Sequence, residues 1–241
     1  MPVVTRSLKT LAQKALGAGH LEITRAGNVP RFDLLFRNLK RYGLEPKAVF
    51  DIGVDTGTPE LYEAFPAADF SLFDPSPASL PHMRRICSAI GGRYFNVALG
   101  DVDGSASLSV NPENTGGSAL IAAVDTPEHH TVPVKRFDSL LTSVARPSLM
   151  KIDAQGYEMK ILAGMGNLLD QIDVYIIETA TFSFHPERAT FDQLHSFMRE
   201  CGFCLHEIVG LLRRPLDGML CHIDAVYVKE QSPLRSDCRW G

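Results

Sequence analysis

Short apolar runs alternate with longer amphipathic segments through most of this chain. The runs are apolar along most of their length, as strands covered on both faces must be, and the segments between them fit helices. Because this alternation is typical of a doubly wound parallel sheet, the sequence predicts an α/β fold. The strand-like runs are AVFDI (48–52), DFSLFD (69–74), RYFNVAL (93–99), SLMKID (148–153) and VYIIET (174–179), and the helical segments are 58–65, 76–90, 156–169 and 188–201.

Two regions depart from the alternation. Between residues 100 and 147 the pattern becomes short and alternating, as in SASLSV and TVPVKRF, which predicts a β excursion over 105–136 between the third and fourth strands. Near the end, FCLHEIV (203–209) and CHIDAVYV (221–228) are separated by a segment short enough for a hairpin. We therefore expect a mostly parallel seven-stranded sheet that ends in an antiparallel hairpin, with the excursion at the rim of the active site.

The 241 residues, 45% of them hydrophobic, suffice for one sizeable core. We expect a helical N-terminal extension over 1–44, with helices near 5–17 and 31–42, a main domain over 45–230 and a loosely held tail over 231–241. No run of about 18 apolar residues occurs, so no membrane span is expected. The amphipathic, lysine-bearing start without an apolar signal segment predicts a cytoplasmic protein.

The net charge and the cysteine content argue against several kinds of partner and site. The net charge of −4 and the lack of a basic stripe argue against a nucleic-acid partner. Five cysteines in a chain of this length argue against a secreted disulfide framework. A zinc site built from Cys201, Cys204, Cys221 and His222 is an alternative, but Cys201 and Cys204 end a predicted helix, so we favour structural cysteines.

The first strand-like run ends in an acid and a glycine-rich turn, VFDIGVDTG (49–57). In an open α/β sheet, ligands bind beyond the carboxyl ends of the strands. The second run ends in Asp74, followed by Pro75. Because an acid at this position accepts hydrogen bonds from the two hydroxyls of a ribose, the sequence predicts a ligand that contains a nucleoside.

The glycine-rich turn separates two classes of such ligands. A pyrophosphate site usually has the pattern G-x-G-x-x-G, whereas this chain has only Gly53 and Gly57. Asp51 and Asp55 flank the expected phosphate position, and a carboxylate 4 Å from a phosphate costs about 4 kcal/mol at an effective dielectric constant of 20. S-adenosylmethionine carries a sulfonium and an ammonium instead, so the acids favour it over NAD. The alternative is that the glycines only shape a turn and the acids are solvated.

The segment KIDAQGYEMKILAG (151–164), together with VFDIGVDTG and further blocks along the chain, resembles the FkbM family of S-adenosylmethionine-dependent methyltransferases. The first of these is the most specific and is similar to the family pattern K-I-D-x-E-G-x-E-x-x-V/I-L-x-G. The resemblance covers about residues 45–228 and implies a Rossmann-like class I methyltransferase fold and methyl transfer to a hydroxyl of a sugar or natural product. The other blocks are VFDIGVDTG, SLFDPSP, FNVALGDVDGSASL, DVYIIET and IDAVYV.

The resemblance also implies a set of cofactor-binding positions. Two residues depart from the family pattern: Asp55 stands where an asparagine is usual, and Gln155 where an acid is usual. Asp55 keeps an acceptor but loses a donor, and Gln155 removes a charge. The expected cofactor-binding residues are Asp51, Gly53, Asp55, Thr56, Gly57, Asp74 and Asn96.

Methyl transfer to an alcohol needs in-line alignment and a group that accepts the hydroxyl proton. Three residues at or after strand ends qualify: Asp153, Glu178 and His185. We expect His185 to be the base, because its ordinary pKa of about 6.5 suits the task. A divalent metal held by Asp153 and Glu178 is an alternative, but no third acid is fixed nearby, so no metal is expected.

The acceptor is expected to be a small molecule or a glycan. Arg213 and Arg214, between the last two strands, are candidates to bind its carboxylate or phosphate, and Asn114 and Ser118 are candidate polar contacts from the excursion. Two other functions stay open: a catalytically silent nucleoside-binding module, suggested by Asp55 and Gln155, and the less favoured NAD-dependent oxidoreductase. The sequence does not predict an oligomeric state.

Overall fold

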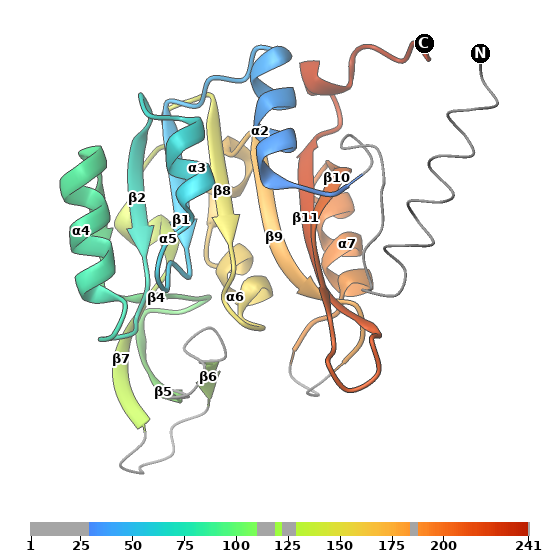
Figure 1. The fold of residues 1–241 in the computed structure, drawn as a ribbon. Coiled ribbons are helices and arrows are strands. Elements are labelled where there is room, and N and C mark those ends of the chain that lie inside the picture. The colour runs from blue at the N-terminus through green and yellow to red at the C-terminus, as the bar shows by residue number, and fades with distance from the viewer. Residues whose placement is uncertain (1–28, 110–118, 122–128, 184–187, 241) are drawn as a thin grey trace, which may run out of the picture.

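The structure, a computed structural model, describes residues 29–109, 119–121, 129–183 and 188–240. Its centre is a seven-stranded sheet in the order β10-β11-β9-β8-β1-β2-β3 (Figure 1). Neighbouring strands are parallel except on the two sides of β11, which is antiparallel to β9 and to β10. This confirms the mostly parallel sheet with a C-terminal hairpin. The strands are β1 (Ala48–Ile52), β2 (Asp69–Phe73), β3 (Arg93–Phe95), β8 (Ser148–Ile152), β9 (Val174–Ala180), β10 (Phe203–Arg213) and β11 (Leu220–Lys229).

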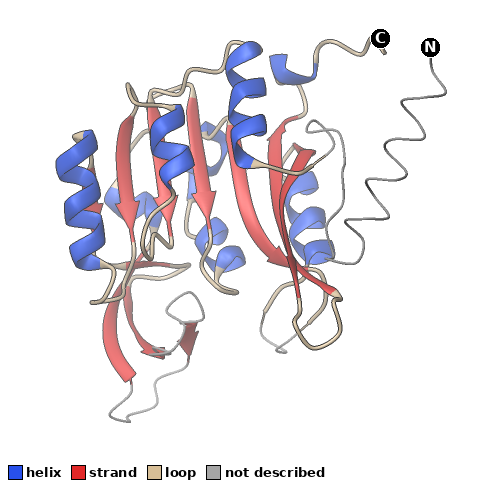
Figure 2. Ribbon diagram, in the orientation of Figure 1, coloured by secondary structure: helices blue, strands red, loops and turns tan. Residues whose placement is uncertain are grey.

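Helices cover both faces of this sheet (Figure 2). On one face, α2, α3 and α4 pack against alternate side chains of the strands, such as Val49 and Ile176. On the other face, α5, α6, η3 and α7 pack against the intervening ones, such as Phe50 and Ile177. The helices are α2 (Phe32–Arg41), α3 (Pro59–Ala64), α4 (Leu80–Ile90), α5 (Phe137–Leu140), α6 (Glu158–Ala163), η3 (Gly166–Gln171), α7 (Phe191–Glu200) and the terminal η4 (Pro233–Arg235).

This double cover explains why the central strands are apolar along their length. Every residue of β1 and β8 is buried, and the side chains of Val49, Leu149 and Ile176 have no exposed surface. Burying one such side chain stabilises the fold by about 1.5 to 3 kcal/mol. Two charged residues interrupt the apolar pattern, Asp51 in β1 and Lys151 in β8, and both are buried on the same face as Val49 and Leu149, the α2 side.

The predicted β excursion is confirmed. A second sheet, in the order β4-β7-β5-β6, lies beyond the carboxyl ends of β1 and β2 (Figure 1). Two of its residues, Leu108 and Val134, are buried in a small core of their own. The strands are β4 (Ala98–Leu99), β5 (Gly104–Ser109), β6 (Ala119–Ile121) and β7 (His129–Lys135). The candidate acceptor contacts Asn114 and Ser118 lie outside the described residues.

Three predicted boundaries were wrong. The run 93–99 is not one strand, because the chain leaves the main sheet after Phe95 and pairs Ala98 with Val134 of β7. The helix predicted over 156–169 divides at Gly164, where a Cβ would lie 1.9 Å from the carbonyl oxygen of Gly100. The hairpin strands are longer than predicted, so that Arg213 belongs to β10.

The two ends of the chain are described in part. The helix predicted near 31–42 is α2, which packs on the sheet through Leu35 and Leu39, whereas the helix predicted over 5–17 lies outside the described residues. In the tail, Leu234 packs against the core. Within the described ranges, no helix is long and apolar enough to cross a membrane.

Candidate active site

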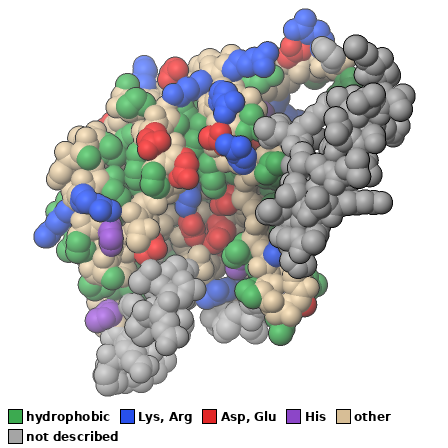
Figure 3. All heavy atoms as spheres, in the orientation of Figure 1, with side chains coloured by type: hydrophobic (Ala, Val, Ile, Leu, Met, Phe, Trp, Pro, Cys, Tyr) green, Lys and Arg blue, Asp and Glu red, His purple; other side chains and the backbone are tan. Residues whose placement is uncertain are grey.

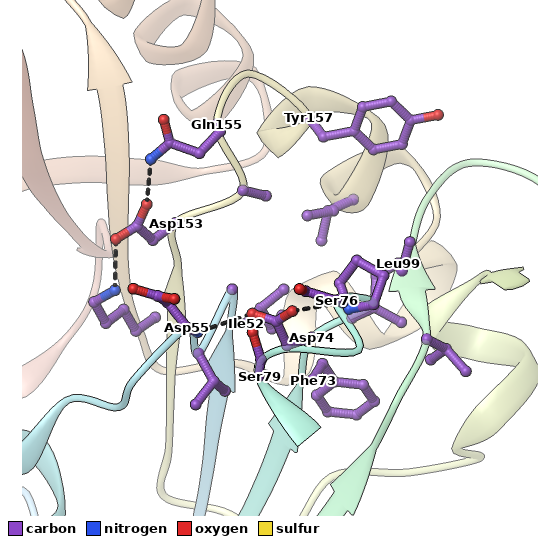
Figure 4. A pocket seen from close by; sticks show the side chains of 18 of the residues that line it. Ile52, Asp55, Phe73, Asp74, Ser76, Ser79, Leu99, Asp153, Gln155 and Tyr157 are labelled. Atoms are coloured by element: carbon purple, nitrogen blue, oxygen red, sulfur yellow. Dashed lines mark hydrogen bonds and ion pairs between the residues drawn. The ribbon is translucent and has the colours of Figure 1, made fainter. Parts of the chain in front are cut away.

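A cavity of about 230 Å³ opens at the carboxyl ends of β1, β2 and β8, between the main sheet and the excursion (Figure 4). Four expected cofactor-binding residues of the glycine-rich turn line it, and so does Asp74. Because parallel strands end at one edge of a sheet, segments far apart in the sequence meet there. The four turn residues are Gly53, Asp55, Thr56 and Gly57.

The glycine-rich turn has a backbone that only certain residues adopt without strain. Gly53 has φ 79°, and a Cβ there would lie 1.8 Å from the carbonyl oxygen of Asp153. Gly57 has φ 111°, and Asp55 also has a positive φ, 46°, which aspartate tolerates better than most residues. Gly53 therefore allows the turn after β1 to pass close to the end of β8.

Asp74 is held rigidly at the end of β2. Its two carboxylate oxygens accept hydrogen bonds of 2.8 Å from the backbone N–H groups of Asp55 and Ser76. Burial raises the pKa of Asp74, and these donors oppose that shift. Asn96 does not line the cavity, but its side-chain amide donates to the carbonyl oxygens of Asp74 and Ser76 at 2.7 and 3.2 Å. Asn96 thus supports the segment that carries the acid.

One end of the cavity is apolar. Phe73, Val97, Leu99 and Leu108 line it, the last from the excursion. The ring of Phe73 is stacked on that of Phe95, with centroids 4.6 Å apart, which fixes its position. These side chains form a surface suited to a flat aromatic group such as a nucleobase.

The other end carries a polar network built on β8 and β9. Lys151 Nζ donates to Asp153 Oδ2 at 3.0 Å, and Gln155 Nε2 donates to Asp153 Oδ1 and to Glu178 Oε2, both at 3.0 Å. Gln155 has φ 53°, a left-handed conformation that turns its side chain back toward the strand ends. Acidic side chains gather in a hollow on this side of the molecule (Figure 3).

The two carboxyl groups of this network differ in protonation. Burial opposes ionisation of Asp153, but the charge of Lys151 and three hydrogen-bond partners hold its pKa below the ordinary value. Burial and the neighbouring Asp153 carboxylate raise the pKa of Glu178 to about 9. At neutral pH the pair therefore holds one proton, on Glu178, and one negative charge, on Asp153.

Asp51, expected in the cofactor site, does not line the cavity. Its side chain has no exposed surface, and Oδ2 accepts a 2.5 Å hydrogen bond from the hydroxyl of Tyr62 in α3. The reason is the alternation of side chains along a strand, which directs Asp51 into the α2 side of the sheet. Burial opposes the positive charge of Lys151, but the carboxylates of Asp153 and Asp51 outweigh burial and raise the pKa of Lys151.

The donor set fits a cationic nucleoside better than a dinucleotide. Of the residues that line the cavity, Lys151 is the one cationic side chain, and Asp153 already pairs with it. A pyrophosphate would meet Asp55, Asp74 and Asp153 without a free cation to balance them. The same carboxylates favour a sulfonium and an ammonium, and Asp74 with the apolar end provides for a ribose and an adenine.

A comparison of sequences supports this interpretation. The family described as "Methyltransferase FkbM domain" matches residues 51–205, which includes the glycine-rich turn, Asp74 and the Asp153 network. The chain belongs to the FkbM family of S-adenosylmethionine-dependent methyltransferases. The resemblance seen in the sequence blocks is therefore confirmed.

Two curated relatives are similar over part of their length. The hexuronic acid methyltransferase AglP of Haloferax volcanii is 25% identical over 136 residues, 56% of this chain and 56% of the relative. Methyltransferase 1 of Beauveria bassiana is 28% identical over 157 residues, 54% of this chain and 63% of the relative. Among solved structures, 1,6-didemethyltoxoflavin-N1-methyltransferase of Burkholderia thailandensis is 16% identical with a TM-score of 0.43, covering 95% of this chain and 90% of that one.

The other expected site residues are placed as follows. Asp153 and Glu178 lie together, whereas His185 lies outside the described residues. Arg213 Nη1 donates to the carbonyl oxygen of Gly218, and Arg214 pairs with Asp217. Neither arginine lines the cavity, so their role in acceptor binding stays a prediction.

The metal alternatives have little support in the described part of the chain. No group of three or more histidine, cysteine or acidic residues is placed there to hold a metal ion. Of the zinc candidates, Cys221 donates its thiol hydrogen to the carbonyl oxygen of Leu212 at 3.2 Å. Asp153 and Glu178 are joined by a glutamine amide, which is a donor to both and not a metal ligand at that atom.

Sequence reasoning missed residues that act across the strands. Lys151, Tyr62 and Asp224 all bear on the charge of the site: Lys151 directly, Tyr62 through Asp51, and Asp224 as a further carboxyl whose pKa burial raises to about 6. A signal for Lys151 was available, because a lysine inside a buried strand requires a charged partner. No comparable signal in the sequence paired Tyr62 with Asp51.

Proposed function

We propose that the protein transfers the methyl group of S-adenosylmethionine to a hydroxyl group of a sugar or related natural product. The observation that carries this proposal is the cavity itself, which joins an apolar end, a ribose-type acid and an anionic end without a free cation for phosphate. The relative from Haloferax volcanii, whose name specifies a hexuronic acid, supports a sugar acceptor.

Different residues of the cavity would bind different parts of S-adenosylmethionine. Asp74 would accept a hydrogen bond from a ribose hydroxyl, since its carboxylate offers about four lone-pair positions and the N–H groups of Asp55 and Ser76 and the Ser79 side chain use three. Phe73, Val97 and Leu99 would contact the adenine. The turn at Gly53 and the Asp153 carboxylate would face the cationic amino-acid end, where charge attraction replaces the phosphate contacts of dinucleotide sites.

The Asp153–Glu178 pair is one candidate to receive the proton of the acceptor hydroxyl, through the ionised Asp153 carboxylate. S-adenosylmethionine supplies an electrophilic methyl group, whose carbon–sulfur bond breaks as the new oxygen–carbon bond forms and whose bonding electron pair stays on sulfur. The proton of the attacking hydroxyl would pass to the ionised member of the pair and then to solvent. Gln155 positions both carboxyl groups for this role through its two 3.0 Å hydrogen bonds.

His185, the base expected from the sequence, lies outside the described residues and stays a prediction. His185→Ala would then lower turnover by about 10²- to 10⁴-fold with an unchanged cofactor dissociation constant, and the wild-type rate would rise with pH through the histidine titration. Near-normal turnover of His185→Ala would leave Asp153, Glu178 or solvent as the proton acceptor, with catalysis resting on alignment alone. A rate abolished by EDTA and restored by Mg²⁺ would instead indicate a metal at Asp153 and Glu178.

Two measurements test the proposed function. Thermal stabilisation by S-adenosylhomocysteine and not by NAD is expected, because only the former lacks phosphates. Incubation of the protein with methyl-labelled cofactor and a panel of sugars, followed by mass spectrometry, should then yield a labelled ether. Stabilisation by NAD alone would refute the proposal, and tight cofactor binding without transfer to any acceptor would favour the silent nucleoside-binding module.

A further inference from the structure

A second, smaller cavity adjoins the first at the same edge of the sheet. Gln155 lines both, and the second is also lined by Glu178, His222 and Arg188. The shared residue is the one that holds the proposed proton-accepting pair. Arg188 therefore lies beside the residue that holds this pair.

The backbone and side chain of Arg188 are held in place from two sides. Thr190, two residues further on, forms a parallel bridge with Ala180 at the end of β9 and caps α7. The Arg188 side chain lies across Gly156, where an added Cβ would be 2.5 Å from its Cγ and 2.9 Å from its Nε. Gly156, with φ 100°, leaves the space that this arginine occupies.

Within the described residues, the guanidinium of Arg188 has no ion-pair or hydrogen-bond partner. In the described ranges, the ion pairs and hydrogen bonds of the arginines Arg136, Arg146 and Arg214 engage neighbouring aspartates, but none involves Arg188. Its neighbour Glu178 is protonated at neutral pH and does not neutralise it. The half-buried side chain of Arg188 thus lines a cavity beside the transfer site, and its planar guanidinium group carries five N–H donors arranged as a fork.

The geometry of the Arg188 guanidinium and the charges near it favour one class of anion as its ligand. A planar carboxylate matches two parallel N–H groups of arginine. The ionised Asp153 is hydrogen-bonded to Gln155, which lines the same cavity, and adds a negative charge close by. The geometry of the guanidinium thus suits a carboxylate, and the nearby acid disfavours a more highly charged group than the arginine can balance.

We infer that Arg188 binds the carboxylate of the acceptor, so that the acceptor is a hydroxy acid of the sugar-acid type and the methyl group goes to one of its hydroxyls. This inference rests on the proposed function. In this arrangement the carboxylate is held by Arg188 on the outer side of Gln155, and a hydroxyl is presented to the Asp153–Glu178 pair. The product is an ether, stable to mild base, and not a methyl ester.

The test compares matched acids and neutral sugars. Glucuronate, galacturonate and gluconate would be titrated into the protein saturated with S-adenosylhomocysteine, alongside glucose and galactose, with calorimetry as the readout. We expect at least one acid to bind, and Arg188→Gln to weaken that binding by about 10- to 100-fold, as the loss of a charged hydrogen-bonded pair does. Arg188→Lys should recover part of it, because it keeps the charge and loses the fork.

The controls separate this inference from the proposed function. Arg93→Gln, which alters a surface arginine paired with Asp69 at the far edge strand β3, should leave acid binding unchanged. S-adenosylhomocysteine should bind Arg188→Gln as it binds the wild type. If no acid binds the wild type more tightly than Arg188→Gln, or if a base-labile ester forms, the inference is overturned while the methyltransferase assignment stands. Failure of S-adenosylhomocysteine to bind the wild type would overturn the proposed function itself.

Discussion

Glu178→Gln is expected to raise the free energy of unfolding relative to the wild type, and this difference should grow as the pH rises. The wild-type carboxyl has an ordinary pKa of 4.5, which the fold raises to about 9 through burial and the charge of Asp153. Between these values the unfolded chain has Glu178 ionised while the folded chain keeps it protonated. A raised pKa contributes stability that is complete below pH 4.5 and is lost as the pH rises toward 9.

The magnitude follows from the proton difference. One proton bound in the folded state and absent from the unfolded state changes the free energy of unfolding by about 1.4 kcal/mol for each pH unit. From pH 5.5 to 7.5 the wild type should therefore lose about 2.7 kcal/mol through this group. Glutamine is a neutral replacement of the same shape that keeps the acceptor for Gln155, so the variant should not show this loss.

Urea unfolding followed by circular dichroism at pH 5.5, 6.5 and 7.5 measures the effect. The difference in unfolding free energy between Glu178→Gln and the wild type should grow with pH, whereas Glu63→Gln, on the exposed side of α3, should track the wild type. Parallel pH profiles for Glu178→Gln and the wild type would show that Glu178 is ionised in the folded protein. The argument for a proton held by the Asp153–Glu178 pair would then fail.

Three further predictions concern the donor cavity. Asp74→Ala should weaken S-adenosylhomocysteine binding by about 1.5 to 3 kcal/mol in calorimetry, with Asp74→Asn milder, and an unchanged dissociation constant would remove Asp74 from the ribose site. Tyr62→Phe should lower the free energy of unfolding by about 1 to 3 kcal/mol, because buried Asp51 loses a 2.5 Å donor; a smaller loss would show that other donors suffice. Gly53→Ala should abolish cofactor binding, since its Cβ would meet the Asp153 carbonyl oxygen; retained thermal stabilisation by S-adenosylhomocysteine would contradict this.

The predicted fold depended on local patterns, and its errors lie where contacts distant in sequence decide. Apolar runs predicted the central strands of the main sheet because β1, β8 and β9 are buried on both faces. The run 93–99 was misread because its last residues pair with β7, which lies more than 30 residues further along the chain. Likewise, Gly164 divides a predicted helix because the backbone at Gly100 packs against it.

For the site, the sequence by itself determined the residues that sit at the ends of single strands. Gly53 and Asp74 follow strands directly, and parallel strands bring such ends together whatever the rest of the chain does. Only the tertiary structure decided the protonation of Asp153 and Glu178, because their pKa values depend on burial and on Lys151 and Gln155. The position of Arg188 across Gly156 is likewise decided by a contact between two segments that are far apart in the sequence. Electrostatic interactions depend on distances in the folded structure, which the order of residues along the chain does not specify.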